Sequence, residues 1–313
     1  MIDVKEHVAS KFAKLVAAGA FCGLLVCAAS STAVAGSVEQ PGETVGLSLG
    51  APIPEGVYYV DTLNWGVRSN AVKTALGVNI PVIAWSTPWT LFNGRVEFFA
   101  AWPELEAGTT AAPGFPSTYN YSLYNPIILG NVAWDLGNGF GFRYGIGNYF
   151  DYGAPLAWSS NSLRQDFSLS YTGNNWDLTA TVIYGIGLDQ FTPGRVQVAP
   201  CINQATLQVG NCNNDYVNLD LTATKKFGKW ELGPVAFGSW DVSSPVVGYQ
   251  KQSEFAVGGL VGYNFGPVNL QAFLTRTVAE QNYGGFDTRG WVRITVPLWN
   301  PATPVSTRPI YTK

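Results

Sequence analysis

Apolar and polar residues alternate along most of this chain after residue 35, in segments of roughly ten residues. Between 217 and 224, for example, Val, Leu, Leu and Ala occupy one set of positions, and Asn, Asp and two Thr occupy the other. This period places the two sets on opposite faces of a β-strand, so that one face meets an apolar phase and the other meets water. Many such segments in succession are typical of a transmembrane β-barrel.

The number of alternating segments supports the same fold. About twelve segments lie near 57–66, 71–84, 93–102, 125–136, 139–150, 165–172, 176–184, 217–224, 233–240, 255–265, 268–274 and 289–298. Short turns alternate with long connections between them, and an even number of strands returns both ends of a barrel to one side. We therefore predict an all-β fold, a transmembrane antiparallel β-barrel of about 12 strands in the outer membrane of a Gram-negative bacterium.

A secreted β-sandwich is the alternative, but it requires polar outer faces, whereas the consistent face here carries Trp, Tyr, Phe, Leu and Val. Pro234 and Gly238 interrupt one segment and predict a bulge there. Aromatic residues gather at segment ends, as in the interfacial girdles of membrane barrels. These residues are Trp102, Trp176, Tyr184, Trp230, Trp240, Trp291 and Trp299.

The N-terminus has the features of a cleaved signal peptide. Three lysines precede the apolar run 15–29, and Ala33-Val34-Ala35 supplies the small residues that a signal peptidase recognises. The run is too short for an ordinary spanning helix, which needs about 20 residues. We expect residues 1–35 to be removed, so that the mature chain begins at Gly36. Residues 36–56 are then an N-terminal segment and a candidate plug, 57–299 form the barrel, and 300–313 form a C-terminal tail.

Histidine is missing from the expected mature chain, because the only one is His7. This excludes a Ser-His-Asp triad and an imidazole metal site, so we expect neither enzyme activity nor a metal or cofactor. Charged residues make up 12% of the chain and the longest basic cluster is Lys225-Lys226, which argues against nucleic-acid binding. Glu104 and Glu106 could pair on one strand face, but we favour two solvated loop acids.

Cys201 and Cys212 are the only cysteines of the expected mature chain, and both fall in one long connection. An isolated pair in an oxidising compartment is expected to form a disulfide. The spacing does not match the C-x-x-C motif of redox-active pairs, so we predict a structural bond.

The polar set of positions is expected to face the lumen, and it carries charges of both signs. These charges are Lys73, Glu97, Arg143, Arg164, Asp166, Asp177, Asp220, Glu254, Arg289 and Arg293. Apolar residues fall in the same set, which suits a hydrophobic or aromatic solute better than a water-filled pore. They are Ile83, Phe99, Leu260, Phe273 and Trp291.

We therefore predict a solute path along the lumen, in which an arginine steers an anionic or phenolic head while aromatic rings hold the solute. Stacking and cation–π contacts of this kind contribute about 0.5–2 kcal/mol each. The candidate residues are Phe99, Arg143, Phe273, Arg289, Trp291 and Arg293. The competing interpretation is that the arginines only pair with Asp166, Asp177 or Glu254 and fill space.

Four stretches resemble an outer-membrane family named for the meta-pathway of phenol degradation. They are PGETVGLSLG (41–50), LTATKKFGKWELGPVAFGS (221–239), GYQKQSEFAVGGLVGYNFGPV (248–268) and NYGGFDTRGWVRITVPLW (282–299). The resemblance covers nearly the whole expected mature chain and implies a β-barrel transporter associated with the catabolism of aromatic compounds.

Two functions therefore remain open. One is a channel for uptake of small hydrophobic or aromatic compounds, and the other is a structural or surface-interaction barrel with a closed lumen. The expected partners are outer-membrane lipid, the barrel-assembly machinery and, for the channel, a small hydrophobic or aromatic solute.

Overall fold

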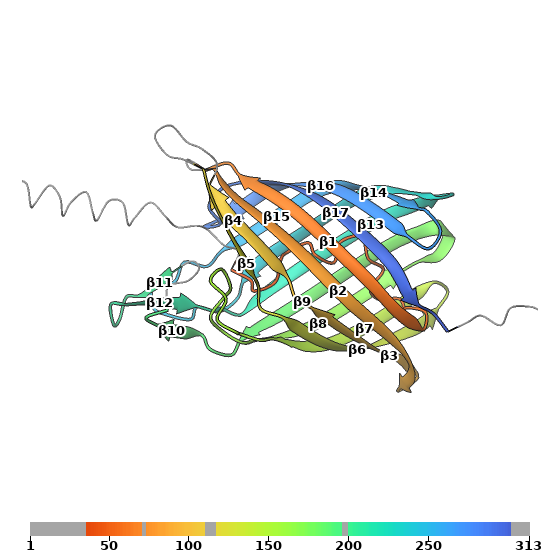
Figure 1. Ribbon diagram of the computed structural model, residues 1–313, viewed down its shortest axis with the longest axis horizontal. Coiled ribbons are helices and arrows are strands. Elements are labelled where there is room, and N and C mark those ends of the chain that lie inside the picture. Colours follow the sequence, from red (N-terminus) through yellow and green to blue (C-terminus); the bar gives the residue numbers. More distant parts are fainter. Residues whose placement is uncertain (1–35, 71–72, 110–116, 196–199, 302–313) are drawn as a thin grey trace, which may run out of the picture.

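Twelve antiparallel strands close into a barrel within residues 36–70, 73–109, 117–195 and 200–301, the parts of the chain described by the computed structural model (Figure 1). In chain order these strands are β1 (Gly56–Arg68), β2 (Thr74–Leu91), β3 (Gly94–Ala101), β6 (Ile127–Gly137), β7 (Phe140–Tyr149), β8 (Ser162–Tyr171), β9 (Trp176–Gly187), β13 (Tyr216–Phe227), β14 (Trp230–Asp241), β15 (Ser253–Asn264), β16 (Asn269–Gln281) and β17 (Asp287–Trp299). The barrel closes because β1 pairs with both β17 and β2, so that Thr62 lies opposite Arg293 on one side and Ile80 on the other. The predicted fold class and strand number are confirmed.

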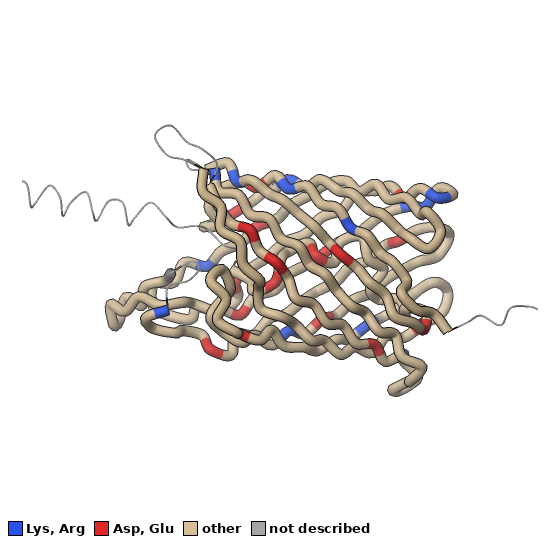
Figure 2. Tube along the Cα trace, viewed as in Figure 1, with Lys and Arg blue, Asp and Glu red and all other residues tan. Residues whose placement is uncertain are grey.

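Side chains alternate between the lumen and the outer surface along each strand, as the sequence period predicts. On β8, Asp166 and Ser168 are fully buried, whereas Phe167 and Leu169 are 41% and 49% exposed. Charged residues are sparse (Figure 2). Thirteen of the charged strand residues are buried, namely Arg68, Glu97, Arg143, Arg164, Asp166, Asp177, Asp220, Glu231, Asp241, Glu254, Asp287, Arg289 and Arg293. The outer surface is therefore apolar and the lumen is polar, which is the arrangement of a membrane barrel.

The two ends of the barrel differ. One end has tight turns, such as 138–139 between β6 and β7 and 228–229 between β13 and β14, and the other end has the long connections. Short turns of outer-membrane barrels face the periplasm, so we call the end with the long connections the outer end. Exposed aromatic residues gather near the turns, and they include Phe92, Phe140, Trp176, Phe227, Trp230, Phe265 and Trp299. No helix in the described ranges has the length and apolar character needed to cross a bilayer.

The connection 103–124 contains a hairpin rather than an open loop. β4 (Glu104–Thr109) pairs with β5 (Thr118–Leu123) and with the first part of β2. Because β2 has 18 residues and β3 has only 8, part of the β2 edge is left free by β3 and is covered by β4. Glu104 and Glu106 therefore lie on a strand, with Leu105 buried between them, and their interpretation as solvated loop acids is wrong.

A small three-stranded sheet forms in the long connection between β9 and β13. It consists of β10 (Phe191–Pro193), β11 (Pro200–Asn203) and β12 (Gln208–Cys212). A disulfide joins Cys201 of β11 to Cys212 of β12, with Cα atoms 5.8 Å apart. The predicted bond is thereby confirmed, and it holds together an outer loop structure that has little core of its own.

Four details of the sequence interpretation are wrong. Ile83 points outward and is 44% exposed, because β2 carries apolar residues on both faces and the alternation did not fix its phase. Lys73 precedes β2 and is exposed rather than facing the lumen. Trp291 lies in the middle of β17, 2% exposed inside the barrel, and not in a girdle. Pro234 causes no bulge: β13 and β14 keep one register from end to end, although no pair is formed at Pro234.

Candidate functional site

Residues 36–55, which we call the lumen segment, lie inside the barrel and run from its outer end to its turn end (Figure 1, red to orange). The segment belongs to no strand. It forms successive tight turns instead. The backbone amide of Glu43 donates to the backbone carbonyl of Gln40 at 3.1 Å, and that of Leu47 donates to the backbone carbonyl of Thr44 at 3.1 Å. Its backbone groups therefore depend on side chains of the barrel wall for further hydrogen bonds. The predicted signal peptide, residues 1–35, and residues 302–313 of the predicted tail lie outside the described residues.

Asp220 on β13 holds the middle of the lumen segment. Its Oδ1 accepts a hydrogen bond from the Gly42 amide at 3.0 Å, and its Oδ2 accepts two from Thr44, from the amide at 2.9 Å and the hydroxyl at 2.6 Å. Two residues further along β13, the hydroxyl of Thr222 accepts from the Gly46 amide at 2.7 Å. The alternation of β13 thus supplies two lumen-facing acceptors to one turn of the segment.

Arg293 on β17 holds the same turn from another wall. Its guanidinium donates to the carbonyl oxygens of Glu43, at 2.5 Å, and of Val45, and to the Thr62 hydroxyl at 2.8 Å. Gly46 has φ +82°, and a Cβ there would lie 2.7 Å from a methyl carbon of Leu260. Only glycine accommodates this backbone so close to the wall.

Val45 inserts into an apolar patch on β14 to β17. Phe273 and Trp291 stack with ring centroids 5.0 Å apart and an interplanar angle of 12°, and Phe237 meets Trp291 edge-on at 6.0 Å. The indole nitrogen of Trp291 donates to the Thr275 hydroxyl at 3.0 Å. The aromatic rings of this wall therefore pack against one another and against Val45, and the polar atom of the Trp291 indole already has a hydrogen-bond partner in the protein.

Arg164 on β8 gathers the acidic side chains of the lumen. It pairs with Asp166 at 2.7 Å and with two acids of the lumen segment, Glu43 at 2.5 Å and Glu39 at 3.5 Å. Arg143 on β7 lies 3.5 Å from Asp166. These charges are all largely buried, so removing Arg164 would leave Glu39 and Glu43 without their ion-pair partner, at a cost of several kcal/mol.

The part of the lumen segment nearest the turn end is hydrogen-bonded to β9, β8 and β3. Ser48 donates to Asp177 of β9, and the amide of Gly50 donates to the Ser170 hydroxyl at 2.9 Å. The amide of Ile53 donates to Glu97 of β3 at 2.8 Å. The segment is consequently fixed to strands on all sides of the barrel, and it fills most of the lumen.

A cavity of about 100 Å³ remains between the lumen segment and the wall formed by β1, β2, β3 and β6. Leu47 and Leu49 close it from the segment side. Its wall is chiefly apolar and includes Ile80, Val82, Phe99, Ala101, Ile127 and Leu129. Four charged residues also line it, namely Glu43, Arg143, Arg164 and Asp166. The guanidinium carbon of Arg143 lies 5.3 Å from the centre of the Phe99 ring. We call this space the wall cavity.

The six residues of the predicted solute path fall into two groups. Phe99 and Arg143 meet at the wall cavity. The other four lie on β16 and β17, where Arg289 pairs with Asp287 at 2.7 Å and the guanidinium of Arg293 lies 5.7 Å from the Phe273 ring. Sequence reasoning did not find the acids Glu39 and Glu43, because they belong to no alternating segment. No group of three His, Cys, Asp or Glu residues suited to a metal ion occurs within the described ranges.

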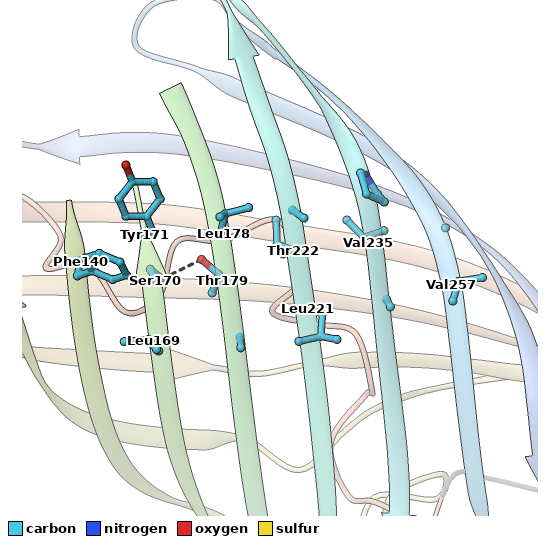
Figure 3. A pocket seen from close by; sticks show the side chains of 15 residues that line it. Phe140, Leu169, Ser170, Tyr171, Leu178, Thr179, Leu221, Thr222, Val235 and Val257 are labelled. Carbon is cyan, nitrogen blue, oxygen red and sulfur yellow. Dashed lines mark hydrogen bonds between the residues drawn. The ribbon is translucent and has the colours of Figure 1, made fainter. Parts of the chain in front are cut away.

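A larger hollow, of about 780 Å³, lies on the outer surface of the barrel across β8 to β15 (Figure 3). Small residues at Ala180, Ala223 and Ala236 form its floor between larger ones such as Leu169 and Val257. Its exposed side chains, such as Leu169, Leu178 and Val257, belong to the outward-facing set, so in a bilayer the hollow contacts lipid.

Comparisons with known proteins agree with this architecture. The family model described as the MetA-pathway of phenol degradation matches residues 39–294. The chain belongs to this family. Its place is the outer membrane of a Gram-negative bacterium.

Among solved structures, an outer membrane channel from Pseudomonas putida F1 is similar in fold, with a TM-score of 0.62 and 10% identity over 82% of this chain and 99% of that one. A mutant form of the TodX monoaromatic hydrocarbon channel has a TM-score of 0.43 and 9% identity over 80% of this chain and 92% of that one. No protein with a curated description matches the sequence significantly.

Proposed function

We propose that this barrel is an outer-membrane channel for the uptake of small hydrophobic or aromatic compounds, and that it is not an enzyme. The observation that carries the proposal is the wall cavity, an unfilled space inside the barrel whose lining is chiefly apolar. A general diffusion pore requires a water-filled lumen, whereas here the lumen segment occupies it.

The size and chemistry of the wall cavity suit a single aromatic ring. An apolar protein cavity of about 150 Å³ binds benzene, so a small outward movement of Leu47 and Leu49 would admit a ring beside Phe99. Arg143, which lines the cavity beside Asp166, would attract a phenolic oxygen or a carboxylate. The family description, which refers to phenol degradation, supports the same class of solute.

A closed structural barrel is the second candidate, and the anchoring of the lumen segment favours it. Asp220, Arg293 and Arg164 each hold the segment through buried polar contacts. Under this alternative the segment never moves and the wall cavity is only a packing defect. Under the channel proposal the segment shifts to let solute pass.

Uptake measurements separate the two candidates. Purified barrel is placed in vesicles with a lipopolysaccharide outer leaflet, and uptake of 4-fluorophenol, a fatty acid and a disaccharide is compared with uptake by barrel-free vesicles. We expect at least fivefold faster, saturable uptake of fluorophenol and no acceleration for the disaccharide. Equal acceleration of all three solutes would indicate a general pore, and no acceleration of any would indicate a closed barrel.

A further inference from the structure

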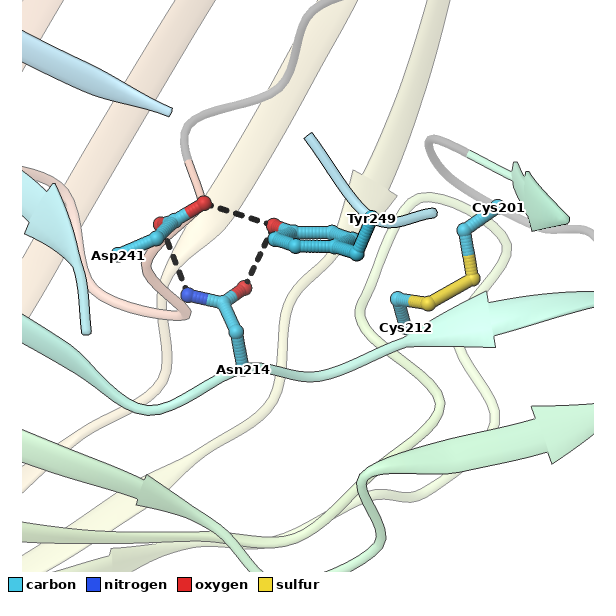
Figure 4. Close-up of a disulfide and its surroundings, with 5 residues drawn as sticks. All are labelled: Cys201, Cys212, Asn214, Asp241 and Tyr249. Carbon is cyan, nitrogen blue, oxygen red and sulfur yellow. Dashed lines mark hydrogen bonds between the residues drawn. A yellow bond between two sulfur atoms is a disulfide. The ribbon is translucent and has the colours of Figure 1, made fainter. Parts of the chain in front are cut away.

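Asp241, the last residue of β14, carries a buried carboxylate at the outer end of the barrel (Figure 4). Its Oδ2 accepts hydrogen bonds from the Tyr249 hydroxyl and the Gln252 amide, both at 2.8 Å. Its Oδ1 accepts one from the side-chain amide of Asn214, at 2.8 Å. A carboxylate has about four acceptor positions, so one position remains on Oδ1.

The three donors to Asp241 are neutral, and a buried carboxylate is favourable only when a cation or further strong donors compensate its charge. The charge of Lys251 acts on Asp241, but its ammonium donates to the Val242 carbonyl at 2.8 Å. Lys251 is therefore hydrogen-bonded to a backbone carbonyl, which leaves the fourth acceptor position of the carboxylate available to another cation.

Gly36, the first residue of the lumen segment, lies beside the Asp241 carboxylate. A methyl group built on Gly36 would overlap the carboxylate of Asp241, with Oδ1 as the nearest atom. The α-nitrogen is two bonds from such a methyl group, so standard bond lengths place it within about 4.5 Å of Oδ1. Ser37, Val38 and Glu39 are all buried, so the start of the segment is enclosed and not fraying in solvent.

We propose that the mature N-terminus of this protein is bound by Asp241. Signal peptidase would hydrolyse the Ala35–Gly36 bond with one water molecule, leaving a carboxylate on Ala35 and an ammonium group on Gly36. That ammonium is the missing cation, and it donates to the free position on Oδ1. Glycine is required here because any side chain would displace the carboxylate.

This pairing fixes the outer end of the lumen segment, and it forms only in the processed chain. An uncleaved or extended N-terminus would have no charge at Gly36 and would have to pass Asp241. The inference does not depend on which solute the barrel carries.

The reactivity of the α-amine tests this pairing directly. Processed protein is purified from outer membranes, its N-terminal residue is verified as Gly36 by mass spectrometry, and the rate of acylation by an N-hydroxysuccinimide ester is measured at pH 7.5. An ordinary α-amine has a pKa of about 7.7–8.0 and reacts readily near this pH. We expect labelling of the wild-type terminus to be at least tenfold slower than labelling of Asp241→Asn, and the exposed-site control Asp189→Asn to match wild type.

A second variant avoids any effect of Asp241 on folding. Insertion of Ala-Ser between Ala35 and Gly36 moves the ammonium away and leaves the barrel unchanged, and folding is verified by heat-modifiable gel migration. Fast labelling of the extended terminus supports the pairing. Equal labelling rates in wild type, Asp241→Asn and the extended protein, or a mature terminus other than Gly36, would overturn the proposal.

Discussion

Asp220 of β13 and Thr44 of the lumen segment are joined by two hydrogen bonds, one from the Thr44 amide at 2.9 Å and one from its hydroxyl at 2.6 Å. The residues are 176 positions apart in the chain. A buried carboxylate that satisfies donors of a segment without strand partners holds that segment strongly, because each donor would otherwise be left unsatisfied. This contact therefore helps to hold the lumen segment inside the barrel.

Replacement of Asp220 by Asn should loosen the lumen segment. The amide has one acceptor oxygen instead of two and no charge, so we expect the seated state to lose roughly 1–3 kcal/mol. Single-channel recordings in planar bilayers should then show more frequent openings and higher mean conductance. Asp135→Asn, at an exposed position near the turn end of β6, is the matched control and should behave as wild type. Identical traces for both variants would contradict the anchoring role.

Arg293→Lys should weaken the same turn without changing the net charge. A lysine ammonium cannot reproduce the planar fork that reaches the Glu43 and Val45 carbonyls and the Thr62 hydroxyl together. We expect hydrogen exchange of the amides at 43–47 to accelerate about tenfold, in proportion to a loss of roughly 1–2 kcal/mol. Arg276→Lys, on the exposed face of β16, should leave these amides unchanged. Protection that survives in Arg293→Lys would show that the fork is dispensable.

Loss of the disulfide should affect only the outer loop. Cys201 and Cys212 are separated by 11 positions, and closing a loop of that size stabilises it by about 2–3 kcal/mol in the chain-entropy model. The double variant with Ser at both positions should therefore be cleaved by protease within 189–213 faster than wild type. Its heat-modifiable migration should be unchanged, since no barrel strand depends on the bond. Loss of the folded barrel band would contradict this separation.

Tyr249, in the outer loop after β14, should stay protonated at alkaline pH. Burial, together with the charge of the Asp241 carboxylate and the hydrogen bond that it accepts from the hydroxyl, raises the pKa of Tyr249 far above its usual value of about 10. A raised pKa means that the hydroxyl stabilises the loop fully below pH 10 and that this contribution is lost only as pH rises through the folded-state value. Absorbance at 295 nm measures ionised tyrosine. The difference in this absorbance between wild type and Tyr249→Phe should thus be absent at pH 11 in folded protein and appear on denaturation. A difference already present in folded protein near pH 10 would refute the shift.

The strand arrangement follows from local signals and could be predicted. Period-two alternation predicted twelve strands, and the isolated pair Cys201 and Cys212 predicted its bond. The phase of β2 could not be predicted, because Val82 and Ile83 are both apolar and either could face lipid. The β4–β5 hairpin was missed for another reason, since it depends on the difference in length between β2 and β3.

The lumen contacts were largely beyond sequence reasoning. Lumen-facing Asp220 and Arg293 were expected, but their partners are backbone groups of residues 42–46, which carry no periodic signal. The glycines of PGETVGLSLG were the available clue, because Gly42 and Gly46 both have positive φ and lie against the wall. The wall cavity itself depends on how the lumen segment packs, and no local pattern encodes that.

The most direct test of the channel proposal is to fill the wall cavity with a larger side chain on the lumen-facing side of β2. Val82→Phe adds a ring inside the cavity, whereas the matched control Ile83→Phe places the same ring on the lipid-facing surface one residue away. Both variants should fold, as judged by heat-modifiable migration. In vesicles with a lipopolysaccharide leaflet we expect Val82→Phe to lower the rate of fluorophenol uptake at least fivefold and Ile83→Phe to retain the wild-type rate. Equal uptake by the two variants would contradict the claim that solute passes through this cavity.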